Sequence, residues 1–227
     1  MIKSNDKERL SNEDTKIYMA IREAIQNNAF PPGFRLIERD LAKQFGTSRT
    51  PIRSAINRLT VEGYIDQSQY KGAVVKRLSP QDIQRLLEVR EALEGMACRL
   101  AAEYVTDEDK TQLQNIISNM YDAVEQNDFL RYYGLSGEFH TKFAECSNNP
   151  YLFELVQRVN LQTTRFQFRI ILVPGRIKES VQEHKEIVEK IINGDGIGAE
   201  ECMRGHIRKV KTMLLSNKDD NNSFIAY

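Results

Sequence analysis

The stretch GTSRTPIRSAINRLTVEG, from Gly46 to Gly63, has the pattern of a short amphipathic helix. Ser48 is a suitable N-cap, and a proline at position 51 falls in the first turn, where its missing N–H has no intrahelical partner to lose. The apolar residues that follow recur at helical spacing and predict one buried stripe, made of Ile52, Ala55, Ile56 and Leu59. Arg49 and Arg53 lie on the opposite face. The helix is expected to pack on one side and present guanidinium groups on the other, although an ordinary solvated helix shows the same pattern.

The residues before this stretch predict two more helices. A helix is expected over residues 14–27, with a polar, frayed segment at 1–13 before it and the proline pair that begins at Pro31 after it. Apolar residues within 41–45 indicate a second short helix that ends at Gly46, because glycine is common just after a helix C-terminus. A helix, a Gly-containing turn and a second helix form a helix-turn-helix, whose second helix enters the major groove of DNA.

The residues after the stretch predict a β-hairpin. Residues 64–67 and 73–75 are two β-prone runs on either side of a Gly-containing turn at 69–72. Three helices followed by a hairpin make a winged helix-turn-helix domain.

Four segments of this region carry a resemblance to a known family. They are AFPPGFRL at 29–36, ERDLA at 38–42, SRTPIR at 48–53, and the run from Arg58-Leu59 to Glu62-Gly63. In this order, over about sixty residues, they resemble the N-terminal domain of the GntR family of bacterial transcription regulators. The sequence departs from the family at Ile37, where other members often have Ser or another capping residue.

The resemblance implies which residues contact DNA. The matching positions are Arg39, Ser48, Arg49, Thr50 and Arg53, with Lys71 and Gly72 at the tip of the wing. Arg49 and Arg53 suit bidentate contacts to guanine O6 and N7, whereas hydroxyl groups and the wing suit phosphate contacts that set the register. Arg35 is expected to support a phosphate contact. The resemblance further implies a homodimer on a short inverted repeat with GT…AC half-sites.

Length and charge are consistent with two domains of opposite charge. The chain has 227 residues, is 41% apolar and has a formal net charge of zero. Residues 1–78 contain 14 Lys and Arg against 9 Asp and Glu, a balance of +5, so residues 79–227, with 18 against 23, have a balance of −5. The basic part carries the helix-turn-helix, as attraction to phosphate requires. We expect a DNA-binding domain at 1–78, a ligand-binding and dimerisation domain at 79–219 and a tail at 220–227.

Other features favour a cytoplasmic protein. No basic-then-apolar start is present, and no apolar run approaches about 18 residues, the length of a membrane span. Cys98, Cys146 and Cys202 are odd in number and lack paired spacing, so they are interpreted as packing residues in a reducing compartment.

The second half is expected to be entirely helical. Ser79-Pro80 has the pattern of an N-cap followed by proline at the first helical position. Six segments follow, with breaks at Asn, Gly and Pro residues: 80–104, 107–126, 128–147, 150–172, 175–193 and 197–216. A six-helix bundle is the simplest arrangement. The predicted fold class is therefore mainly α, a winged helix-turn-helix followed by an all-α bundle.

The three histidines of the chain all fall inside predicted helices of this second half. His140, His184 and His206 would hold a divalent metal if they converged. Their spacing alone is not a metal motif, and independent surface or core histidines remain the alternative.

A second resemblance bears on these histidines. The segments VREALE at 89–94, EFH at 138–140, EHKEI at 183–187 and His206 resemble the helical FCD effector domain of the FadR branch, in its shorter six-helix VanR-like subgroup. Many members bind a metal through three histidines and one Asp or Asn. This chain has Ser136 at the fourth position, and a neutral hydroxyl is a poorer ligand. One possibility is that three histidines and water hold a metal, which would suit zinc or nickel more than manganese. The alternatives are a weakened metal site, or a pocket that binds a carboxylate ligand directly without a metal.

Arg90 lies one turn before Glu94 on the first helix of this domain. It would either clamp a carboxylate or phosphate of an effector in the cavity or form a surface ion pair with Glu94. Four further residues are expected to be packing or surface residues rather than ligand contacts: Tyr132, Tyr133, Arg165 and Arg169.

The resulting hypothesis is a cytoplasmic, dimeric, metabolite-responsive DNA-binding transcription regulator that acts as a repressor. One alternative is an architectural DNA binder whose helical domain only dimerises. Another is a metal-dependent enzyme, but no H-E-x-x-H, Gly-rich phosphate loop or G-x-S-x-G motif is present, and a complete DNA-reading domain would go unused. The sequence leaves the effector and the regulated genes undetermined.

Overall fold

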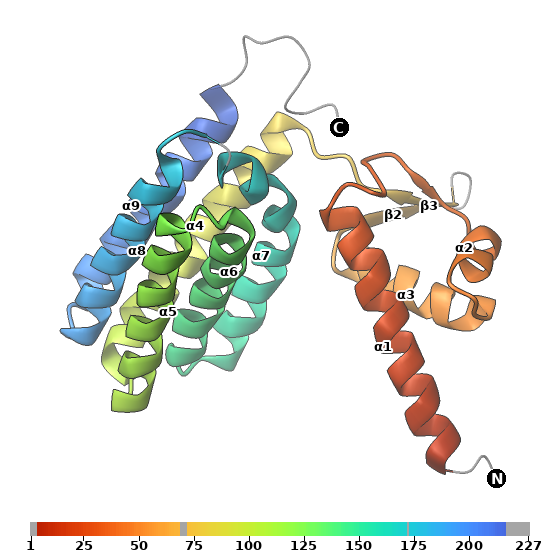
Figure 1. The fold of residues 1–227 in the computed structure, drawn as a ribbon, viewed down its shortest axis with the longest axis horizontal. Coiled ribbons are helices and arrows are strands. Elements are labelled where there is room, and N and C mark those ends of the chain that lie inside the picture. Colours follow the sequence, from red (N-terminus) through yellow and green to blue (C-terminus); the bar gives the residue numbers. More distant parts are fainter. Residues whose placement is uncertain (1–3, 69–71, 172, 217–227) are drawn as a thin grey trace. The chain divides into compact units, whose positions relative to one another are not determined.

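The computed structural model describes residues 4–68, 72–171 and 173–216. The described residues fall into two compact units, the first ending at Ser79 and the second beginning at Pro80 (Figure 1). Lys71 and the expected tail at 220–227 lie outside the described residues.

The first unit contains three helices: α1 (Ser4–Gln26), α2 (Glu38–Gln44) and α3 (Arg49–Val61). The predicted apolar stripe of α3 is confirmed, because each of its four residues is at most 2% exposed. This stripe packs against α1 and α2. The predicted helix-turn-helix is therefore present, and the arginine-bearing face of α3 points away from the core.

Helix α1 begins ten residues earlier than predicted. The segment from Ser4 to Glu13 contains no Gly or Pro and has several good helix formers, so the helix continues through it. At the other end, Asn28 adopts a left-handed conformation with φ of 65°, which is a common way to end a helix.

The predicted hairpin is present and is joined by a strand that the sequence did not indicate. Strands β2 (Ile65–Ser68) and β3 (Gly72–Val75) pair antiparallel. Strand β1 (Arg35–Leu36) pairs with the other edge of β3, so the sheet order is β1-β3-β2. Two residues are too few to show the alternation that identifies a strand. The burial of Leu36 against the core brings β1 to the sheet.

The second unit is a bundle of six helices in the described residues, and each matches one predicted segment to within a few residues. They are α4 (Pro80–Tyr104), α5 (Asp107–Glu125), α6 (Phe129–Cys146), α7 (Pro150–Ile171), α8 (Arg176–Ile192) and α9 (Gly196–Ser216). Helix α4 contacts four of the others, α6 to α9, and so lies among them in the bundle (Figure 1). In the part of the chain that the structure describes, no helix is both long and apolar enough to cross a membrane.

Local caps explain where these helices begin and end. Thr106 and Asp109 form a capping box at the start of α5. Asn127 and Asn148 take left-handed conformations after α5 and α6, at two of the predicted breaks.

All three cysteines are free thiols. Cys98 and Cys146 are buried, and burial raises the pKa of both. Their environment therefore suits the expected packing role.

Candidate DNA interface and metal centre

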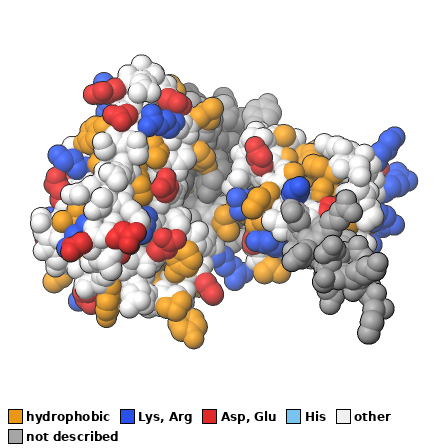
Figure 2. Space-filling view, turned by 60° about the horizontal axis from the view of Figure 1, so that its bottom comes forward, with side chains coloured by type: hydrophobic (Ala, Val, Ile, Leu, Met, Phe, Trp, Pro, Cys, Tyr) orange, Lys and Arg blue, Asp and Glu red, His pale blue; other side chains and the backbone are white. Residues whose placement is uncertain are grey.

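The exposed face of α3 presents two arginines. The side chains of Arg49 and Arg53 are 63% and 57% exposed. They lie four residues apart and therefore project from the same side of the helix. In Figure 2, several Lys and Arg side chains lie at one end of the smaller unit, whereas acidic and basic side chains are interspersed on the visible face of the larger unit.

Glu38, the first residue of α2, joins both arginines. It accepts hydrogen bonds from Arg53 Nε and Nη2 at 2.9 Å and from Arg49 Nη2 at 3.0 Å. The two hydrogen bonds from Arg53 and the one from Arg49 together outweigh burial and lower the pKa of Glu38 to about 2. Sequence reasoning missed this role, because Glu38 lies eleven and fifteen residues before its partners and no periodic pattern connects them.

The other predicted DNA contacts also lie on the first unit. Ser48 occupies the N-cap of α3, as predicted, but its side chain makes no cap hydrogen bond. Thr50 and Arg39 are exposed, and Arg39 contacts its neighbour Asp40 at 3.2 Å. Arg35 is exposed on β1 and Gly72 begins β3 with φ of 69°.

The three histidines converge in the middle of the bundle. His140 comes from α6, His184 from α8 and His206 from α9, and they are 4%, 0% and 5% exposed. One possible ligand atom from each lies within 4.8 Å of the other two. They converge because each occupies the inward apolar stripe of its helix, as His184 does beside Ile187 and Val188.

The surroundings of the cluster suit a divalent metal. Burial lowers the pKa of all three imidazoles, that of His206 to about 4, so they are neutral at pH 7 and carry the lone pairs that a metal requires. Neither ring nitrogen of His184 has a hydrogen-bond partner among the described residues. An unpartnered buried polar atom is costly, and metal coordination would satisfy one of the two.

A cavity of about 40 Å³ adjoins the cluster and is lined by His140, His206 and Ser136. It has room for roughly three water molecules. Ser136 thus lies beside two of the histidines, where the family resemblance places the fourth ligand.

Tyr132 and Tyr133, expected only to pack, also line this cavity. Tyr132, Ser136 and His140 are spaced four residues apart and share one face of α6, which brings the tyrosine to the same space. The side chains of Arg165 and Arg169 lie outside the described residues.

Arg90 was predicted either to line the cavity or to form a surface ion pair with Glu94, and the structure shows part of each. It does pair with Glu94, with Nε 3.0 Å from Oε1, but the pair is buried rather than on the surface, the side chains being 2% and 1% exposed. Helix α4 lies between four other helices, so both residues are covered. Arg90 lines the cavity from there.

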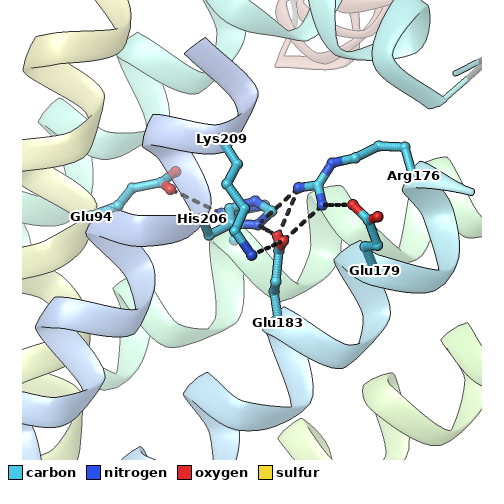
Figure 3. A network of polar contacts seen from close by, with 7 residues as sticks. Glu94, Arg176, Glu179, Glu183, His206 and Lys209 are labelled. Atoms are coloured by element: carbon cyan, nitrogen blue, oxygen red, sulfur yellow. Dashed lines mark hydrogen bonds and ion pairs between the residues drawn. The ribbon is translucent and has the colours of Figure 1, made fainter. Parts of the chain in front are cut away.

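Arg176 is a second cavity arginine, which sequence reasoning missed. It donates two hydrogen bonds to Glu183, at 2.8 and 2.7 Å, and its side chain is 2% exposed (Figure 3). Glu183 Oε2 lies 2.6 Å from His206 Nδ1, and Lys209 donates to Glu183 Oε1 at 3.0 Å. The sequence does show an acidic residue, Glu183, next to His184. It does not show the partners of Glu183, because these lie on another turn of α8 and on α9.

Glu94, which is buried, and Glu183, whose side chain is 11% exposed, are both ionised at neutral pH. Burial raises the pKa of Glu94, but the charge of Arg90, together with the contact to His140, outweighs burial and lowers that pKa to about 2. For Glu183 burial is likewise outweighed, by hydrogen bonds from His206 and Arg176, which hold its pKa well below the usual range. Each carboxylate is therefore charged and shared between an arginine and a histidine.

Comparison with known families assigns a description to each unit. The profile of the FCD domain matches residues 85–209, and that of bacterial regulatory proteins of the gntR family matches residues 14–75.

Individual relatives support both assignments. An HTH-type transcriptional regulator from the TAR-I ttuE-ttuC' intergenic region of Agrobacterium vitis is 37% identical over 57% of this chain and 78% of its own length. The HTH-type transcriptional regulator LutR of Bacillus subtilis is 28% identical over 87% of this chain and 99% of its own length. The solved structure of Escherichia coli McbR/YncC shares the fold, with a TM-score of 0.78, 22% identity, and coverage of 91% of this chain and 99% of that one.

Proposed function

Because the chain belongs to the GntR family of transcription regulators and carries their FCD domain, we propose that it is a metabolite-responsive repressor whose two units divide the work. The first unit binds operator DNA, and the second binds a divalent metal and a small carboxylate effector. The matched relatives are DNA-binding transcription regulators and not enzymes, in agreement with the prediction from sequence. The repressor role takes support from RspR of Escherichia coli, a relative that is named as a repressor.

DNA reading is assigned to the exposed face of α3. Arg49 and Arg53 have the reach and the donors for bidentate contact with guanine, and Glu38 holds both in the free protein. Ser48, Thr50, Arg39 and the wing from Lys71 to Gly72 contact phosphates in this proposal, supported by Arg35. A homodimer places two copies of α3 on an inverted repeat with GT…AC half-sites.

Effector binding is assigned to the histidine cavity, and the observation that carries this part is the convergence of three buried, neutral imidazoles. His140, His184 and His206 would hold the metal, with Ser136 or water completing the set. Imidazole ligands suit zinc or nickel more than manganese. The bound metal would offer a position to a carboxylate oxygen, and Arg90 beside the cavity would pair with that carboxylate.

Regulation follows if the effector and the operator favour different arrangements of the two units. A ligand that binds one arrangement more tightly shifts the population towards it, and the coupling is reciprocal. The protein acts in the cytoplasm in this proposal, where DNA and metabolites are both accessible.

The first experiment measures bound metal by elemental analysis on untagged protein, beside a His140→Ala, His184→Ala double variant. About one metal per chain in the parent and none in the variant is expected. A Lys185→Ala variant, changed at an exposed residue of α8 next to His184, serves as the control and should keep the metal. Absence of metal from the parent would contradict the metal site and leave a direct carboxylate pocket.

A second experiment tests regulation. An operator is first selected from a random DNA pool, and its release is then titrated with short carboxylates. Release by at least one carboxylate in the parent, lost in the histidine double variant, is expected. DNA binding that no carboxylate changes would instead support a purely architectural DNA binder.

A further inference from the structure

We propose that Glu94 and Glu183 are positioning residues of the metal centre, each joining one metal-binding histidine to one cavity arginine. The inference rests on the proposed three-histidine site and adds to it the groups that orient the ligands and connect them to the effector. Two sets of contacts support it. The first set is Arg176–Glu183–His206, and the second set is Arg90–Glu94–His140.

In Arg176–Glu183–His206, both contacts of the glutamate are hydrogen bonds (Figure 3). Glu183 Oε2 lies between Arg176 Nη2, at 2.7 Å, and His206 Nδ1, at 2.6 Å. Glu183 accepts hydrogen bonds from Arg176 and Lys209, as a carboxylate does, so we assign the proton of His206 to Nδ1, which then donates to Glu183 Oε2. The lone pair is then on Nε2, and the ring is fixed with that atom available to a metal.

The second set of contacts has the same order, an arginine, a glutamate and a histidine, with its glutamate on α4 instead of α8. Glu94 Oε1 accepts from Arg90 Nε at 3.0 Å, and Glu94 Oε2 lies 3.0 Å from His140 Nδ1. These last two atoms lack the alignment of a hydrogen bond, and neither has another partner among the described residues. Each is thus the available partner of the other, at a distance that a hydrogen bond would span.

His184 is held differently. Its ring lies against Phe139, with centroids 4.5 Å apart, and neither of its nitrogens has a hydrogen bond within the described residues. Two of the three ligands are therefore oriented by carboxylates and the third by apolar contacts. The contribution of the glutamates can be measured separately from that of the ligands themselves.

The arrangement also connects the metal to the effector. Arg90 and Arg176 both line the cavity, and each shares its guanidinium with a glutamate that orients a histidine. An effector carboxylate that accepts hydrogen bonds from either arginine competes with the glutamate for that arginine. The glutamate then holds its histidine less firmly, and the histidine shifts. Effector and metal then alter each other's affinity by the same factor, as linkage requires.

The test is zinc affinity of the full chain, measured by competition with a chromophoric chelator. Glu183→Gln and Glu94→Gln keep the side-chain size and remove the charge, and each is expected to weaken zinc binding about 10- to 100-fold. Glu186→Gln on α8 and Glu88→Gln on α4 are exposed, matched controls, expected to stay within about twofold. His184→Ala, which removes a ligand, should weaken binding further than either glutamine variant.

Two additional measurements separate positioning from damage to the fold. Cobalt-loaded Glu183→Gln should keep the ligand-field spectrum of the parent, because its three nitrogen ligands are unchanged. An Arg176→Gln, Glu183→Gln double variant leaves no unpaired arginine beside the missing carboxylate, and its zinc affinity should be as low as that of Glu183→Gln alone.

The outcomes distinguish this inference from the proposed function. Zinc binding that drops in His184→Ala but changes less than threefold in both glutamine variants overturns the positioning role alone. Equal binding by the parent and His184→Ala overturns the metal site, and the positioning role with it. Recovery of parental affinity in the double variant also overturns the positioning role, because the loss would then come from an unpaired charge.

Discussion

The molecule uses the same pair of residue types, arginine and glutamate, in two opposite environments. On the first unit, Glu38 holds Arg49 and Arg53, whose side chains are more than half exposed. In the bundle, Glu94 and Glu183 hold arginines that are 2% exposed. Exposed pairs contribute about 0–1 kcal/mol and exchange partners readily, whereas a buried charge that loses its partner is strongly destabilising.

The difference suits the two proposed functions. An arginine that reads DNA must leave its glutamate for a guanine or a phosphate, which a weak exposed pair allows. A metal ligand must keep one orientation, which a buried, fully charged contact imposes. Exposure therefore decides whether the glutamate loses its arginine at little cost in free energy or only at a large one.

The largest expected effect comes from breaking a buried pair. Arg90→Met leaves the carboxylate of Glu94 buried without its arginine, and we expect the free energy of unfolding of the second unit to fall by about 3–5 kcal/mol. Arg49→Met, the exposed counterpart, should change that of the first unit by less than about 1 kcal/mol. Urea denaturation followed by circular dichroism measures both. Equal losses would contradict the comparison.

The next largest effect concerns DNA binding, where we expect the exposed arginines to matter and the second unit not to. Arg53→Ala is expected to weaken operator binding by about 1–3 kcal/mol, or about 5- to 150-fold, because a bidentate base contact is lost. Its unfolding free energy should fall by less than about 1 kcal/mol, because the exposed pair with Glu38 is lost, and its zinc content should stay at the parental value. Fluorescence anisotropy at fixed salt measures the affinity, and Lys185→Ala removes the same charge from the second unit as a control. An unchanged affinity would remove Arg53 from the DNA interface.

The smallest effect is a pH dependence of the first unit. The pKa of Glu38 is about 2 in the folded protein against an ordinary value of 4.5, so the folded state binds fewer protons between these values. The stability from this group is complete above about pH 4.5 and is lost as the pH falls towards 2. Glu38→Gln should flatten that part of the stability profile, as followed by thermal unfolding at successive pH values. A profile with the parental slope would show that Glu38 is not paired in solution.

Periodic features were predictable from the chain, and paired contacts were not. The stripe from Ile52 to Leu59 and the six helices of the bundle follow from spacing and breaks, so they were placed to within a few residues. Strand β1 was missed because two residues carry no period. The predicted start of α1 was wrong because a polar segment without Gly or Pro can be helical or frayed, and its sequence pattern does not distinguish the two.

The sequence by itself determined the order of the elements, their amphipathic faces and the family, because these depend on neighbours within about a turn of each position. Only the tertiary structure decided that Glu38 meets Arg49 and Arg53, that Arg90 is buried, and that Arg176 reaches His206 through Glu183. These contacts join residues on different turns or different helices. Their geometry depends on how the apolar stripes of whole helices fit together, and no local pattern records that fit.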